Sequence, residues 1–327
     1  MHRRLANEAT LALSLALDGP LLIKAAGMGV DPTRPEMEFV RTRRAGAETV
    51  YLPGSSLKGA LRAHAERIAR TVGGMGPDGR PRLSCNPLTS VPDGPNYSCN
   101  RRLADLAVQR RGRELGGQRA YRESCAVCQL FGNAADAGHL AAYDAYPASP
   151  PRVEQRTGVS IDRVYGSVAE GPFGYEVATT GSFEARLVLQ NFTLAQLGLL
   201  ALTVRDLADG RLAIGYGKSR GLGRVRVESQ RLSVRYPGCT VADGQVVALA
   251  GATIGPTDQL HGVGAFPDTA GYGFPAPDAA PLPGGMPAED DGWGGVELEV
   301  AADGLPFLWR ACVARWAERV RAAAEAS

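Results

Sequence analysis

The order of elements along the chain predicts an α+β fold. Leucines at alternate positions from Leu11 to Leu17 are typical of a half-buried strand, and we expect one strand or a strand pair within residues 8–26. A helical segment, a pair of strand-like segments joined by glycine turns, a second helix and a last strand follow. This order of strand, helix, hairpin, helix and strand is that of a ferredoxin-like or RNA-recognition-motif sheet.

Caps and apolar stripes mark the two helices of this pattern. The first is expected to open at Ser55 or Ser56, because serine is a favourable N-cap, and to run through Ile68. The second is expected over residues 192–207, with Thr193 as its cap. Its predicted buried stripe consists of Leu194, Leu197, Leu200 and Val204.

We divide the chain at residue 234. Residues 1–234 hold the sheet and two additions, an irregular cysteine-rich finger at about 71–135 and a hairpin at about 154–183. Residues 235–327 are a Gly/Pro-rich extension that ends in a helix. That helix carries Trp309, Val313, Trp316 and Val320.

Composition indicates a globular protein. Of 327 residues, 44% are hydrophobic and 21% are charged, which is far from the profile of a disordered chain. No run of about 18 apolar residues is present, so no transmembrane helix is predicted. The first residues resemble a signal peptide, but Glu8 and Asp18 frame the apolar run and no small-residue cleavage site follows. We therefore expect a cytoplasmic protein.

The formal net charge of +2 conceals clusters of cations. Arginine forks suit phosphate groups, so one face built from such clusters could bind nucleic acid even in a nearly neutral protein. Ordinary solvated surfaces in a protein that uses arginine in place of lysine explain the clusters equally well. The clusters are Arg41, Arg43 and Arg44; Arg101 and Arg102; Arg110, Arg111 and Arg113; and Lys218, Arg220, Arg224 and Arg226.

The start of the first helix is a candidate anion site. Ser55 and Ser56 lie at the positive end of the helix dipole, and Lys58 and Arg62 are near enough to contribute. The spacing is not that of a Walker A loop. An ordinary capped helix is the simpler interpretation when these residues are taken alone.

A second candidate is a glycine-rich loop between strands expected at residues 212–214 and 223–227. Glycines without side chains and interleaved cations allow a phosphate chain to approach the backbone closely. Because the loop joins strand to strand, it does not fit a dinucleotide-binding fingerprint. The residues assigned to binding are Gly215, Gly217, Lys218, Ser219, Arg220, Gly221 and Gly223.

Four cysteines predict a structural zinc site. Cys125 and Cys128 form a two-residue knuckle, and Cys85 and Cys99 lie upstream in the finger. His139 is an alternative ligand to Cys85. A redox pair lacks the preceding thioredoxin-like strand, and a disulfide is disfavoured in the cytoplasm. The two remaining cysteines, Cys239 and Cys312, are expected to be buried thiols.

Four segments together resemble one known family. They are LPGSSLKGALR from Leu52, CAVCQLFG from Cys125, RTGVSIDRVYGSV from Arg156 and GYGKSRGLGRVRV from Gly215. In this order they are similar to the RAMP superfamily, specifically to the repeated backbone subunit of type III CRISPR effector complexes, subtype D-like branch included. The resemblance covers roughly residues 8–230 and does not extend into the C-terminal region.

The resemblance implies a modified RNA-recognition-motif palm, a zinc-bearing finger and a thumb hairpin at about 159–173. It implies binding to guide RNA and target RNA, to other effector-complex subunits, and to copies of itself or homologous subunits in a filament. The helix start and the glycine-rich loop would hold guide phosphates, and Arg156 and Arg163 of the hairpin would contact RNA.

Members of the family that cut target RNA use an acidic residue and a divalent metal such as Mg²⁺. The residue lies in the loop between the first strand and first helix. Here Asp31 is the first choice and Glu36 the second, since counting back from Arg41 favours the latter. Two functions follow: a metal-dependent endoribonuclease acting on guide-paired RNA, or a scaffold that only binds RNA. A histidine-driven guide-processing nuclease is less expected, because that loop contains no histidine.

Overall fold

The central feature of the protein is an antiparallel sheet built around one strand. In the computed structural model, β1 (Glu8–Leu17) lies between β8 (Ser182–Gln190) and β9 (Val225–Pro237), and β4 (Leu140–Ala142) pairs with the far side of β8. The residues that the structure describes are 3–25, 35–73, 81–88, 98–109 and 115–325.

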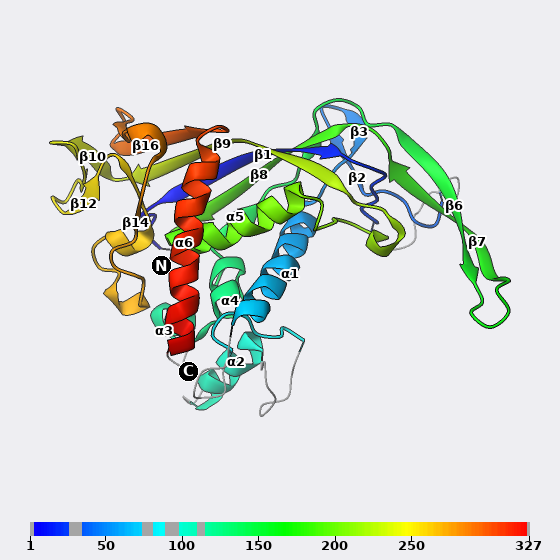
Figure 1. The fold of residues 1–327 in the computed structure, drawn as a ribbon, viewed down its shortest axis with the longest axis horizontal. Coiled ribbons are helices and arrows are strands. Elements are labelled where there is room, and N and C mark those ends of the chain that lie inside the picture. Colours follow the sequence, from blue (N-terminus) through cyan, green and yellow to red (C-terminus); the bar gives the residue numbers. More distant parts are fainter. Residues whose placement is uncertain (1–2, 26–34, 74–80, 89–97, 110–114, 326–327) are drawn as a thin grey trace.

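The helices complete a ferredoxin-like arrangement. Helix α1 (Gly54–Val72) connects β1 to β4, and α5 (Leu194–Ala208) connects β8 to β9. Taken in chain order, the strands of this unit are therefore arranged 4-1-3-2, as the predicted fold requires. Figure 1 shows α1, α5 and the C-terminal α6 (Leu305–Glu325) on the same side of the sheet.

The alternation in β1 explains why one face of the sheet is covered. Leu11, Leu13 and Leu15 are at most 1% exposed, whereas the intervening Ala12 and Ser14 are half-buried on the other face. Because successive side chains of a strand point to opposite faces, the leucines pack into the core beneath the helices.

The predicted start of α1 was wrong in detail. The N-cap is Pro53, without a side-chain cap, and the Gly54 N–H donates to a carboxylate oxygen of Asp144 at 2.8 Å. A Cβ on Gly54 would lie 2.0 Å from the Ala142 carbonyl oxygen, so only glycine permits this approach to β4. The second prediction is confirmed: Thr193 caps α5 in a capping box with Gln196.

The cysteine-rich finger, predicted to be irregular, contains three helices. They are α2 (Cys99–Gln109), α3 (Gly117–Glu123) and α4 (Ala126–Phe131). The predicted hairpin consists of β6 (Val153–Ile161) and β7 (Val168–Ala178), and in Figure 1 it projects beyond the end of the sheet. Residues 212–214 form no strand, so the glycine-rich loop connects α5 directly to β9.

The boundary at residue 234 falls inside β9 and is corrected. Strand β16 of the extension pairs with β9, and α6 packs on α5, so the extension shares the main sheet and core. Besides the hairpin strands β6 and β7, the strands outside the ferredoxin-like unit are β2 (Arg41–Arg44), β3 (Ala47–Val50), β5 (Tyr146–Pro147), β10 (Cys239–Ala242), β11 (Gln245–Ala248), β12 (Thr253–Pro256), β13 (Gln259–His261), β14 (Ala279–Pro281), β15 (Glu289–Asp290) and β16 (Gly295–Ala301). Within the described residues, no helix is both long and apolar enough to cross a membrane.

Candidate nucleic-acid interface and cysteine site

The four cysteines of the finger meet at one buried point. The sulfurs of Cys85, Cys99, Cys125 and Cys128 all lie within 4.8 Å of one another. The Sγ atoms of Cys85 and Cys128 are 3.7 Å apart, which is too long for a disulfide. A tetrahedral zinc ion with Zn–S bonds of about 2.3 Å separates its sulfurs by roughly 3.8 Å. The group is therefore compatible with zinc.

The local structure around each cysteine brings the four sulfurs together. Cys99 begins α2, Cys125 is the N-cap of α4 and Cys128 lies one turn further. The backbone N–H of Cys85 donates to the sulfur of Cys125 at 3.3 Å, and the N–H of Cys125 donates to the sulfur of Cys99 at 3.3 Å. Such bonds stabilise thiolates, which are the form that binds a metal.

Contacts among the four thiols shift their pKa values in opposite directions. Hydrogen bonds from Cys125 and Cys128 lower the pKa of Cys85, and bonds with neighbouring thiols raise the pKa of Cys128. A cation in place of the protons would allow all four sulfurs to be thiolates. His139 is not in the group, since its Nδ1 lies 2.6 Å from the carbonyl oxygen of Gln190.

Arg62, assigned from the sequence to RNA binding, faces the cysteine site. Its guanidinium donates to the sulfur of Cys128 at 3.4 Å, to the carbonyl oxygen of Gly132 at 3.0 Å and to Glu66 at 3.1 Å. These contacts place a positive charge beside the thiolates and leave Arg62 half-buried on the finger side of α1.

At the start of α1, Ser55 is exposed and Ser56 and Lys58 are partly buried. Burial is the main reason that the pKa of Lys58 is lowered, with the charge of Arg62 adding to the effect. Asp144 already accepts from the first amide of the helix. The anion site predicted here therefore includes a carboxylate, which the sequence pattern did not reveal.

The glycine-rich loop is docked on the segment that follows β1. The N–H of Tyr216 donates to the carbonyl oxygen of Leu22 at 2.8 Å, and a Cβ on Gly215 would lie 2.4 Å from the same oxygen. Gly217 and Gly221, both left-handed, flank a short 3-10 turn at Lys218–Arg220. Lys218, Ser219 and Arg220 are exposed on that turn, while Gly223 is buried against residue 214.

The same segment supports the base of the β6–β7 hairpin. Leu21 pairs with Ala178 of β7, and the N–H of Met37 donates to the carbonyl oxygen of Gly174. The described residues on either side of positions 26–34 therefore both contact the hairpin. Glu176 is 4% exposed and binds Arg41 through two hydrogen bonds of 2.7 and 3.0 Å. This ion pair, which sequence reasoning missed, fixes the end of that segment.

Of the two candidate catalytic carboxylates, the structure describes only Glu36. Asp31 lies outside the described residues. Glu36 is exposed, and its neighbours Pro35 and Met37 contact Gly174 at the base of the hairpin. Glu36 is thus beside the base of the hairpin.

The hairpin tip exposes apolar side chains. A carboxylate oxygen of Asp162 accepts from the N–H groups of Val164 and Tyr165, both at 2.7 Å, and these two side chains are 81% and 84% exposed. Arg163, which precedes them, is also exposed, and Arg156 on β6 is half-buried, 3.8 Å from Glu154. A turn built to present large apolar groups to solvent is typical of a binding element.

Comparison with known families now decides the family. The RAMP superfamily model matches residues 15–226, from β1 to the beginning of β9. The chain belongs to the RAMP superfamily. No curated protein matches it. Membership indicates an RNA-binding, CRISPR-associated protein.

The histidines of this RAMP protein that the structure describes are engaged in structural contacts. His64 on α1 has Asp206 at 2.7 Å from Nε2 and Arg67 at 2.9 Å from Nδ1, so both ring nitrogens have partners. The Nε2 of His261 lies 2.8 Å from the carbonyl oxygen of Pro256. Neither arrangement favours a histidine-driven nuclease.

Proposed function

We propose that this RAMP protein is a guide-RNA-binding backbone subunit of a type III CRISPR ribonucleoprotein. The observation that carries the proposal is the shared support of three predicted RNA-contacting segments. Residues 20–25 hydrogen-bond to the glycine-rich loop, to β7 of the hairpin and to residues 38–40. The glycine-rich loop, the base of the hairpin and residues 35–40 therefore lie at the same end of the sheet (Figure 1).

These segments offer different kinds of contact, which suits a guide RNA whose bases must remain free to pair. Lys218 and Arg220 are exposed cations on a turn whose glycines allow close approach of a phosphate chain. Val164 and Tyr165 at the hairpin tip offer apolar surface for insertion between bases. Contacts of both kinds are independent of base sequence, so specificity would come from base pairing.

Binding is tested with the purified protein and guide RNA over a range of salt concentrations. The double variant Lys218→Ala, Arg220→Ala is expected to weaken binding to all sequences alike. Its salt slope should be smaller by about 1.4, since each contact to single-stranded phosphate contributes about 0.7. Arg321→Ala, an exposed arginine on α6, is the matched control and should leave the slope unchanged. An unchanged slope in the double variant would show that the loop does not contact RNA phosphates.

We propose further that the subunit cuts guide-paired target RNA with Asp31 or Glu36 and a divalent metal. The position of Glu36 beside the hairpin supports this, because a hairpin that kinks a duplex exposes a phosphodiester near its base. The finger would carry a structural zinc ion on its four cysteines. A subunit that binds guide and target without cutting is the alternative, and the cleavage assay decides between them.

The assay combines the protein, its guide RNA and partner subunits with a complementary target RNA. Wild type, Asp31→Ala, Glu36→Ala and the exposed control Glu289→Ala are compared with magnesium present or withheld. Magnesium is withheld rather than chelated, because a chelator would also remove zinc. Magnesium-dependent cuts lost in one loop variant and kept in the control identify the carboxylate. Tight binding without cuts in wild type establishes the scaffold.

A further inference from the structure

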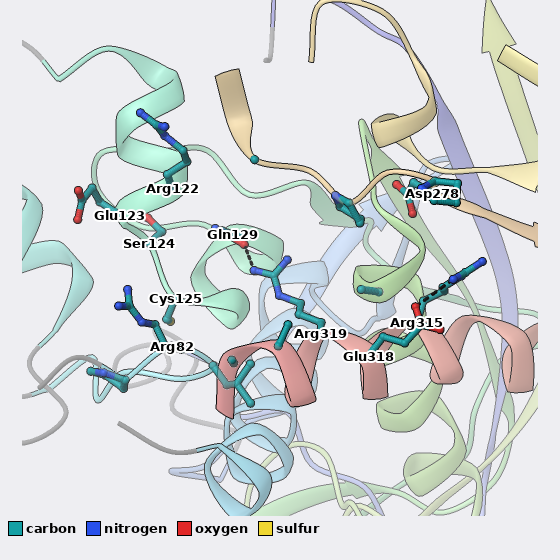
Figure 2. A pocket seen from close by; sticks show the side chains of 18 of the residues that line it. Arg82, Arg122, Glu123, Ser124, Cys125, Gln129, Asp278, Arg315, Glu318 and Arg319 are labelled. Atoms are coloured by element: carbon teal, nitrogen blue, oxygen red, sulfur yellow. Dashed lines mark hydrogen bonds and ion pairs between the residues drawn. The ribbon is translucent and has the colours of Figure 1, made fainter. Parts of the chain in front are cut away.

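A cavity lies between the finger and α6. Its volume is about 430 Å³, within the range of small-molecule sites. Residues 81–83, the α3–α4 junction, residues 273–278 and the last turns of α6 form its walls (Figure 2).

Arginine dominates the polar part of the lining. Five arginines face three carboxylates, and two of the carboxylates are already paired: Glu123 with Arg102, and Glu318 with Arg315 at 2.9 Å. The third, Asp278, accepts from the backbone N–H groups of Leu194 and Gly264. Because the arginines outnumber the carboxylates, the lining has an excess of positive charge.

Two of these arginines have donors to spare. Arg319 on α6 donates to the Gln129 side chain, and its other N–H groups have no hydrogen-bond partner within the described residues. Arg122 on α3 makes neither a hydrogen bond nor an ion pair in the part of the chain that the structure describes. A guanidinium with free N–H groups at the rim of a cavity is a ready partner for a phosphate oxygen.

Much of the rest of the wall is apolar, beside the polar side chains of Ser124 and Gln129. Leu83, Pro275, Pro277 and Ala323 line the cavity alongside the arginines. A cavity of this size exceeds what a bare inorganic anion fills, and apolar walls favour an organic group attached to the anion. The chemistry that matches both walls is a small phosphomonoester.

The two halves of the cavity have different origins. Residues 81–83 and 122–129 lie within the family match, whereas residues 273–278 and 315–323 lie beyond it. The finger half is also tied to the cysteine site, because Ala126 N–H donates to the Arg82 carbonyl oxygen and Val127 N–H to that of Leu83. We infer that the C-terminal extension completes, on the cysteine finger, a binding site for a small phosphomonoester that is separate from the RNA interface.

Isothermal titration of the full-length, zinc-loaded protein tests this inference. Adenosine 5′-monophosphate is expected to bind, inorganic phosphate to bind more weakly, and adenosine not to bind at about 1 mM. Arg319→Gln and Arg122→Gln should each weaken binding by about tenfold, since each removes a charge-assisted hydrogen bond. Arg310→Gln, an exposed arginine on the same helix outside the cavity, should leave it unchanged.

Two sources of phosphomonoester are then distinguished by competition. A trinucleotide RNA with a 5′-phosphate that displaces the mononucleotide, while its 5′-hydroxyl form does not, identifies an RNA end as ligand. Failure of both RNAs to displace it identifies a free mononucleotide. Absence of mononucleotide binding, equal binding of adenosine, or full binding by both Arg122→Gln and Arg319→Gln overturns the inference. Thermal melting of Arg122→Gln, whose side chain has no internal partner among the described residues, separates loss of binding from loss of folding.

Discussion

The finger and the hairpin are both insertions into the same ferredoxin-like unit, yet they are stabilised in opposite ways. In the finger, four cysteines at most 3% exposed meet at one point, and helices α2, α3 and α4 gather around them. In the hairpin, the base is packed against the loop after β1, whereas Val164 and Tyr165 at the tip face solvent. The stability of the finger therefore comes from its buried cysteines, whereas the side chains of the hairpin tip are available to contact a partner.

The largest expected effect concerns the zinc ion proposed for the four cysteines of the finger. Zinc binding contributes on the order of 10 kcal/mol to folding in small structural sites, so Cys128→Ser should abolish zinc binding and unfold the finger. Zinc per chain, measured by atomic emission, and hydrogen exchange over residues 117–131 check this. Cys239→Ser removes a buried thiol outside the group and should retain zinc. A Cys128→Ser protein with full zinc content would falsify the site.

The next effect concerns the base of the hairpin. Glu176→Gln removes the carboxylate that binds Arg41 at 2.7 and 3.0 Å, and losing hydrogen bonds to a charged group costs about 1.5 to 3 kcal/mol of unfolding free energy. The longer ion pairs of Arg41 with Glu38 at 4.0 Å and Glu48 at 3.8 Å remain. Urea unfolding measures the loss. The control is Glu154→Gln on the partner strand, whose ion pairs with Arg152 and Arg156 are partly exposed and contribute at most about 1 kcal/mol. Equal effects of the two variants would mean that the buried pair does not anchor the hairpin.

Asp278, directly before β14, adds a pH dependence to the stability of the protein. Burial raises the pKa of Asp278 from 3.8 to about 6, and the N–H groups of Leu194 and Gly264 and the charges of Arg315 and Arg319 only partly offset it. Because the unfolded chain loses this proton first, stability should fall by roughly 3 kcal/mol as the pH rises from about 4 to about 6. Above that range the contribution is constant.

Denaturant unfolding at several pH values measures this slope in wild type and in Asp278→Asn. The variant cannot ionise at this position, so its stability should lack that fall. Tyr121 on α3 and Cys312 on α6 also face Asp278, but burial raises the pKa of both, and they stay neutral over this range. Identical slopes in the two proteins would assign the dependence to other groups.

The smallest effect on stability is expected at the hairpin tip. Val164→Ser and Tyr165→Ser change exposed side chains and should alter the unfolding free energy by no more than about 0.5 kcal/mol. Val177→Ala, fully buried at the base of the same hairpin, should cost on the order of 2 kcal/mol. Binding of guide-paired target should show the reverse order. A tip variant that unfolds would contradict the small effect expected on stability. A tip variant that binds target as wild type does would show that the tip is not part of the RNA interface.

Local signals in the sequence predicted those parts of the fold that depend on neighbouring residues alone. The alternating leucines of β1 and the N-cap Thr193 of α5 are determined within a few residues, and both are as predicted. The four cysteines could be grouped by residue type, although not their distances.

Predictions failed where a distant residue replaces a local one. Asp144, ninety positions away, accepts from the Gly54 amide in place of a serine cap. Glu176 binds Arg41 across 135 positions, and Arg62 faces Cys128 rather than the surface at the helix start. No periodicity in the sequence encodes contacts of this range, because they arise only when the sheet has assembled.

Strand β16 has a consequence for how copies of the chain can associate. Without it, β9 would be an edge strand, and its unpaired N–H and C=O groups would be a template for another chain. The strand that now lies outermost on this side, β15, has two residues, and both are acidic, Glu289 and Asp290. Short, charged edges discourage sheet growth, so we expect neighbouring copies to meet through side chains and not to merge their sheets at this edge.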